Sequence, residues 1–201
     1  MKKNTKLIFV IIAALVVGSV AYLSLNNGRG GAVSRTAGSK GKLSAGDVIG
    51  QKAPDFSLQD INGNTITLGD FEGKNVLLFF NEGEMCYPAC WNQVEALGTD
   101  ARFNSADTVA FSIVVDTKDQ WRRIESQMPR FKNAKILFDT DRKVSLDYGV
   151  LSLASSMHPG SFPGHTYFLI DKNGVIKFFL DDPNMATRND ELAIEINKLN
   201  K

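Results

Sequence analysis

Residues 75–91 read NVLLFFNEGEMCYPACW, an apolar run that passes through a short polar loop into two cysteines. The run at 75–81 carries no charge, which is typical of a strand buried on both faces of a sheet. Pro88 fits the first turn of a helix, because proline lacks the N–H that this turn leaves unpaired. The stretch therefore predicts a buried strand that leads through Cys86 and Cys90 into a helix.

The segments that follow alternate between strand and helix patterns. Asn173-Gly174 separates two strand patterns, and this dipeptide is the strongest short signal for a hairpin. We expect strands at 108–116, 134–138, 165–171 and 175–180, and helices at 118–128, 142–148 and 189–199. This order predicts an α/β fold, in which a mixed central sheet carries helices on both faces.

The size and charge of the chain narrow the classes of function. Its 201 residues suit one domain of about 150 residues plus a leader. A formal net charge of +1 argues against nucleic acid as a partner. No nucleotide, haem or flavin motif is visible, so no cofactor is expected.

Three lysines precede an uncharged apolar run at 7–25, which is long enough to cross a bilayer as one helix. Residues 1–25 are therefore predicted to be a transmembrane anchor. A cleaved signal peptide is the alternative, with Ser19-Val20-Ala21 as a small-residue cleavage site.

Residues 26–47 are rich in glycine, serine, alanine and basic residues, which is typical of a flexible linker. The folded domain is predicted to span 48–201. An N-terminal anchor ahead of one domain most often leaves that domain on the extracytoplasmic side of the membrane. Disulfides persist in that compartment.

The two cysteines are the only ones in the chain, and they stand four residues apart. Cys86 is predicted just before a helix and Cys90 in its first turn, where unpaired N–H groups and the helix dipole favour a thiolate. Cα atoms so spaced lie roughly 6 Å apart, within disulfide range. The pair is predicted to open and close. Glu82 and Glu84 are expected to be solvated loop charges.

Three further motifs occur in order along the chain: GQKAPDFSL at 50–58, LGDFEGK at 68–74 and YFLIDKNG at 167–174. Together with the cysteine segment they resemble the thioredoxin-fold redoxins, which include the AhpC/TSA peroxiredoxins and the membrane-bound oxidoreductases of the TlpA and ResA kind. The resemblance implies a thioredoxin-like fold and a membrane-tethered thiol–disulfide oxidoreductase or peroxiredoxin-like antioxidant protein. Its substrate would be a protein or small-molecule disulfide or a peroxide, and a thiol would donate the electrons.

The cysteine segment departs from the peroxiredoxin pattern. Peroxiredoxins place a threonine three residues before the reactive cysteine, where this chain has Gly83 before Cys86 and Tyr87 before Cys90. Their helper arginine corresponds to His165. These differences weaken the case for efficient peroxide reduction.

The thioredoxin-like reductases supply the remaining candidates. They carry a cis-proline just before the late strand, and here Pro163 stands two residues early, with His165 at the matching place. The candidate catalytic residues are therefore Cys86, Cys90, His165 and Pro163, the last as a cis-proline. The resemblance to thioredoxins implies Cys86 as the nucleophile, and the resemblance to peroxiredoxins implies Cys90. Cys86 is preferred, because it is expected to be the more exposed cysteine.

Two other interpretations use the same cysteines. The three-residue spacing also resembles the Sco family of copper chaperones, which implies copper bound by Cys86, Cys90 and a histidine, His158 or His165. The other is an interaction module whose disulfide is inert.

Overall fold

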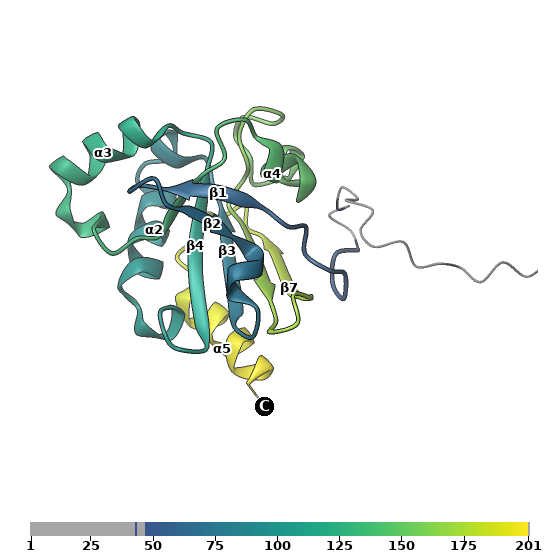
Figure 1. Cartoon of the computed structure of the whole chain (residues 1–201). Helices are drawn as coiled ribbons and strands as arrows, with labels where there is room; N and C mark the ends of the chain where they lie inside the picture. Colours follow the sequence, from purple (N-terminus) through teal and green to yellow (C-terminus); the bar gives the residue numbers. More distant parts are fainter. Residues whose placement is uncertain (1–42, 44–46, 201) are drawn as a thin grey trace, which may run out of the picture. The chain divides into compact units, whose positions relative to one another are not determined.

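The computed structural model describes residue 43 and residues 47–200 (Figure 1). Within these residues no helix is both long and apolar enough to cross a membrane. The predicted anchor, 1–25, and nearly all of the predicted linker lie outside the described residues.

The described part of the chain contains one mixed sheet, with the strand order β2-β1-β5-β4-β3-β6-β7. Strands β3, β4 and β5 run parallel, whereas β1, β6 and β7 each pair antiparallel with their neighbours. The strands are β1 (Ser57–Asp60), β2 (Thr65–Thr67), β3 (Asn75–Phe80), β4 (Thr108–Val114), β5 (Ile136–Phe138), β6 (Thr166–Ile170) and β7 (Ile176–Asp181). The predicted mixed sheet is confirmed.

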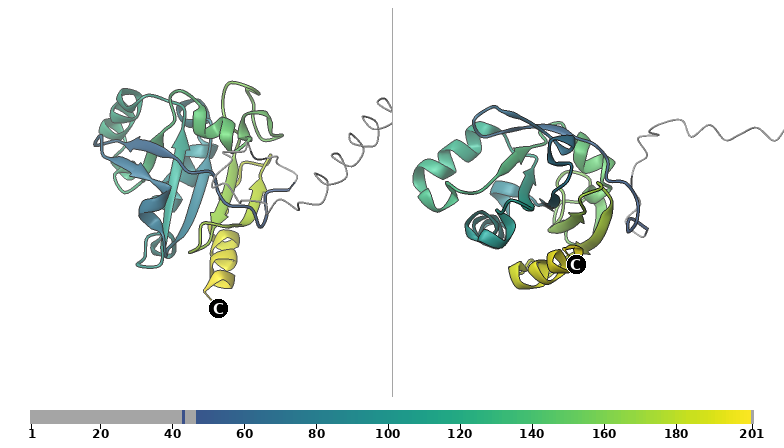
Figure 2. Two further views of the ribbon diagram at one scale, coloured as in Figure 1. Left: turned by 45° about the vertical axis from the view of Figure 1, so that its right-hand side comes forward. Right: turned by 60° about the horizontal axis from the view of Figure 1, so that its bottom comes forward.

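Helices cover both faces of the sheet (Figure 2). They are α2 (Ala89–Thr99), α3 (Lys118–Gln127), α4 (Lys143–Asp147) and α5 (Asn189–Leu199). Buried side chains of α2, α3 and α5 share one apolar core, and α4 contributes to the other. The prediction of helices on both faces is therefore also confirmed.

The central strand β3 shows why its sequence is apolar throughout. Leu77 and Phe79 point into the core under α2, α3 and α5, while Val76, Leu78 and Phe80 point into the core under α4. A strand with neighbours on both edges and helices on both faces has no solvated side, so a continuous apolar run is required.

The sequence patterns missed the hairpin of β1 and β2 at the edge of the sheet. Its register places Leu58 opposite Ile66, and Asp60 closes the turn by accepting hydrogen bonds from the N–H groups of Asn62 and Asn64. Gly63 takes the left-handed conformation that the turn needs. The dipeptide Asn62-Gly63 could have predicted this hairpin, as Asn173-Gly174 predicted the β6–β7 hairpin.

Candidate active site

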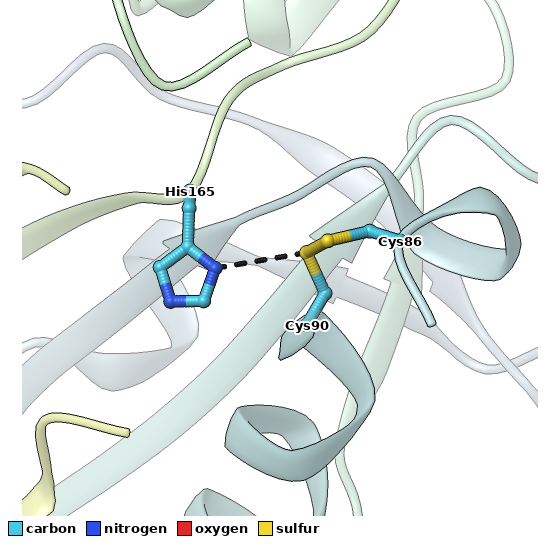
Figure 3. Close-up of side chains that lie close together, drawn as sticks. All are labelled: Cys86, Cys90 and His165. Carbon is cyan, nitrogen blue, oxygen red and sulfur yellow. Dashed lines mark hydrogen bonds between the residues drawn. A yellow bond between two sulfur atoms is a disulfide. The ribbon is translucent and has the colours of Figure 1, made fainter. Parts of the chain in front are cut away.

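The cysteines lie where β3 passes into α2. A short 3-10 helix, η2 (Gly83–Met85), follows the strand and ends at Cys86, and Cys90 lies in the first turn of α2. The two residues form a disulfide with a Cα–Cα distance of 5.3 Å (Figure 3). The prediction that this spacing allows a disulfide is confirmed.

Gly83 allows the loop to turn toward the helix. It has φ +63°, and a Cβ there would overlap the carboxylate of Asp116, with Cγ at 2.7 Å. That carboxylate accepts hydrogen bonds from the N–H of Glu84 and from Nε1 of Trp121, both at 2.8 Å. Burial raises the pKa of Asp116. The loop before Cys86 is thus anchored on a buried acid, and only glycine fits at its centre.

Both sulfur atoms are enclosed in the disulfide form. The exposed fraction is 3 % for Cys86 and 0 % for Cys90, which ranks the two as expected but by a small margin. Met85 and Tyr87, on either side of Cys86, are both exposed. An attacking group therefore approaches the pair from the side of Cys86.

His165 lies against the inner cysteine. It directly precedes β6 and is fully buried, with Nδ1 3.6 Å from Sγ of Cys90 (Figure 3). Its other ring nitrogen, Nε2, is 2.7 Å from the hydroxyl of Tyr167. Burial lowers the pKa of His165 to about 4, so the ring is neutral at pH 7. A neutral imidazole held by a tyrosine thus faces the inner sulfur of the disulfide.

The depressed pKa of His165 predicts a loss of stability in acid. Between pH 6.5 and about 4 the unfolded chain binds a proton on this ring that the folded chain does not, so stability falls as the pH falls. We expect the difference in unfolding free energy between the wild type and His165→Gln to decrease by about 3 kcal/mol from pH 7 to pH 4. Urea unfolding across this range measures it. A constant difference would show that the buried ring titrates normally.

Pro163 is not the cis-proline that the sequence led us to expect. It is buried in the segment before β6, but the cis peptide bond of the described residues is Tyr87–Pro88. Gly164, the next residue, lies so close to the 155–156 segment that a Cβ would be 2.6 Å from the amide nitrogen of Ser156. Pro163 therefore lies buried beside a tightly packed glycine, and the expectation of a cis bond there is wrong.

Glu82 is not a solvated charge. It is almost completely buried, and its Oε1 accepts hydrogen bonds from the N–H groups of Met157 and His158, while Nδ1 of His158 lies 3.0 Å from Oε2. The carboxylate holds the 156–158 loop beside the cysteine segment. His158 therefore pairs with Glu82 and is not the histidine at the cysteines. Glu84 is half-buried and accepts a hydrogen bond from Gln120.

Two residues at the site were missed from the sequence. Tyr167 could have been found, because alternate residues of a strand share a face and it stands two after His165. Met185 could not, because it comes from a loop with no recognisable motif. Its Sδ lies 3.9 Å from Sγ of Cys86.

The site contains the donors of a possible metal centre, since one ligand atom each from Cys86, Cys90 and His165 lie within 4.8 Å of one another. A separate surface pocket of about 880 Å³ is lined by residues of β1, the start of α3 and α4. Its lining includes neither cysteine nor His165, so the pocket is not part of this site.

A cysteine pair at the start of the helix after the central strand of this sheet defines a thioredoxin-fold thiol oxidoreductase. The chain belongs to the AhpC/TSA family, whose family profile matches residues 49–179.

Two relatives illustrate the family. Peroxiredoxin Bcp of Escherichia coli (strain K12) is 31% identical over 156 residues, which are 74% of this chain and 92% of that protein. A peroxiredoxin of Thermoplasma volcanium is 29% identical over 161 residues, covering 75% and 73% of the two chains. These relatives give no support to a copper chaperone.

The fold itself is shared with solved structures of low sequence identity. Mycobacterium tuberculosis AhpC superposes with a TM-score of 0.66 at 19% identity, over 76% of this chain and 93% of that one. A putative protein disulfide isomerase from Bacteroides thetaiotaomicron gives a TM-score of 0.58 at 18% identity, over 75% and 89%.

Proposed function

We propose that the protein reduces a disulfide or a peroxide with the Cys86–Cys90 dithiol, and that a thiol donor of the thioredoxin or glutathione type reduces it again. One observation carries the proposal: the pair is joined as a disulfide with a neutral imidazole 3.6 Å from Cys90. The relatives named peroxiredoxin support the peroxide substrate. The solved yeast mitochondrial 1-Cys peroxiredoxin, whose description names glutathione and thioredoxin systems, suggests the donor.

In disulfide exchange, the Cys86 thiolate attacks one sulfur of the substrate, and the other substrate sulfur leaves as a thiolate. The Cys90 thiolate then attacks Cys86, which closes the disulfide and releases the second substrate thiolate. In peroxide reduction, the Cys86 thiolate takes one peroxide oxygen to form a sulfenic acid, and the alcohol leaves after protonation. The Cys90 thiol then displaces water to form the same disulfide.

His165 acts on Cys90 in both directions. When the disulfide closes, the neutral ring accepts the Cys90 proton or its hydrogen bond. When a donor thiolate attacks Cys86, Cys90 leaves as a thiolate in a buried site and needs a hydrogen bond there. The Tyr167 hydroxyl holds the far nitrogen of the ring and keeps the near one aimed at sulfur.

The N-terminal sequence supports a proposal for where in the cell the protein acts. An apolar run at 7–25 behind basic residues supports a single-pass anchor, with the domain on the extracytoplasmic side. We expect the full chain to stay in the membrane fraction after an alkaline wash. Release into the wash would contradict the tether.

The reduction potential of the pair tests the enzymatic function. The protein is equilibrated with glutathione or dithiothreitol at a series of ratios, and its free thiols are counted. We expect a value of about −120 to −270 mV, the range of exchanging thiol oxidoreductases. A value well below about −300 mV is that of a structural disulfide and would argue against catalysis.

A further inference from the structure

We propose that the reduced pair, together with His165 and Met185, forms a four-coordinate binding site for Cu(I). The donors are two cysteine thiolates, the Nδ1 nitrogen of His165 and the thioether of Met185. Figure 3 shows Cys86, Cys90 and His165 with the cysteines joined as the disulfide. The inference rests on the proposed function only in requiring that a dithiol can reduce the pair.

Met185 is held toward the disulfide by its own loop. It has φ +49°, a left-handed conformation that a side chain rarely adopts, and its N–H bonds to the carbonyl of Asp182. Asp182 is buried, its carboxylate accepts hydrogen bonds from Arg188 and from the N–H of Ala186, and its own N–H donates to the carbonyl of His165. One anchored turn thus sets Met185 relative to the residue that bears the imidazole.

The separations of these donors already suit a common metal ion. Two sulfur ligands about 2.3 Å from a tetrahedral metal lie ~3.8 Å apart, and a sulfur and an imidazole nitrogen lie ~3.6 Å apart. The structure has 3.9 Å between Met185 Sδ and Cys86 Sγ, and 3.6 Å between His165 Nδ1 and Cys90 Sγ. These two separations fit a tetrahedral ion. The two cysteine sulfurs must move apart to bind it, and reduction of their bond releases them.

The chemistry of the donors selects the ion. Thiolate and thioether are soft ligands that favour Cu(I), whereas carboxylates and water favour hard divalent cations. Cys86, Cys90 and His165 are all buried, which shields a bound Cu(I) from water.

Electrons and protons balance in these steps, and the oxidation state of copper does not change. A dithiol donor gives two electrons and two protons to the Cys86–Cys90 bond, and the donor becomes a disulfide. Cu(I) then binds and displaces the two thiol protons, and it stays Cu(I) throughout. The disulfide form offers no thiolate, so the site exists only in the reduced protein.

The test uses the full chain, reduced without oxygen and freed of reductant, with its thiols counted before metal is added. Cu(I) is supplied in competition with a coloured Cu(I) chelator. We expect one ion per chain in the reduced protein and none in the oxidised protein. X-ray absorption at the copper edge is expected to show three sulfur neighbours and one nitrogen neighbour.

Two variants and a matched control assign the ligands. His165→Gln is expected to weaken Cu(I) binding by at least the ~10–100-fold that loss of an outer-shell partner costs. Met185→Leu is expected to weaken it by about tenfold and to remove one sulfur neighbour, because a thioether is a weak ligand. Met157→Leu replaces an exposed methionine of the adjoining loop. It should change neither the affinity for Cu(I) nor the number of sulfur neighbours.

Four outcomes would overturn the site, and the last of them would also refute the proposed function. A protein with two free thiols that takes up no Cu(I) has no such centre, although its redox function stands. If Met185→Leu and Met157→Leu bind Cu(I) with the same affinity and show the same number of sulfur neighbours, Met185 is not the fourth ligand. Binding of Zn(II) in preference to Cu(I) contradicts the soft donor set. If a reductant produces no free thiols at Cys86 and Cys90, both the proposed function and this site are refuted.

Discussion

Replacing Cys86 with serine is expected to reduce turnover to the uncatalysed level, and Cys90→Ser is expected to stop the reaction after one step. A serine hydroxyl is not ionised at neutral pH and cannot replace a thiolate as the nucleophile. Cys90→Ser retains the outer cysteine, which attacks but is not resolved. It should therefore accumulate about one mixed disulfide per chain, whereas Cys86→Ser should accumulate none.

Mass spectrometry of each variant after exposure to a disulfide substrate measures the trapped product. Ala89→Ser serves as the control, because it places a serine between the cysteines and leaves both in place. It should keep turnover. Trapping by Cys86→Ser alone would make Cys90 the nucleophile, and equal trapping by both variants would remove the distinction between an outer and an inner cysteine.

Gly83→Ala is expected to lower the free energy of unfolding by about 3–4 kcal/mol. Part of the cost is the left-handed backbone at φ +63°. The rest is the overlap of the new Cβ with Asp116, whose carboxylate must move away from the N–H of Glu84 and from Trp121. Buried donors left without an acceptor add to the cost of the strain.

Gly73→Ala separates the two contributions. Gly73 also has a left-handed backbone, at φ +84°, but a Cβ there meets nothing within 4 Å. It should cost only the backbone strain, about 1–2 kcal/mol in urea unfolding. Equal losses in the two variants would mean that Asp116 moves aside freely. A double-mutant cycle of Gly83→Ala with Asp116→Ala is expected to be strongly non-additive, since the two residues occupy the same space.

The local pattern of the chain accounts for most of the fold. The apolar run at 75–80, the predicted helices and the Asn173-Gly174 turn all appear where their patterns placed them, with boundaries shifted by one or two residues. Each depends on neighbours within a few positions, which a sequence displays directly. The β1–β2 hairpin was missed because its strands are only four and three residues long.

Contacts between distant segments explain the errors at the site. From the sequence, Glu82 was expected to be a solvated loop charge. Its carboxylate instead accepts hydrogen bonds from the N–H groups of Met157 and His158, which follow it by 75 and 76 positions. Pro163 was proposed as a cis-proline from its spacing to a strand, yet its peptide bond is not cis, and the neighbouring Gly164 lies against the 155–156 segment. Neither partner is visible from the residues around the candidate.

By itself, the sequence determined the mixed sheet, the order of its helices and a cysteine pair close enough to join, because each follows from residues near one another along the chain. Only the tertiary structure decided what surrounds the sulfurs. His165 reaches Cys90 across 75 residues and Met185 reaches Cys86 across 99. Such contacts depend on how the elements pack, and no local periodicity encodes them.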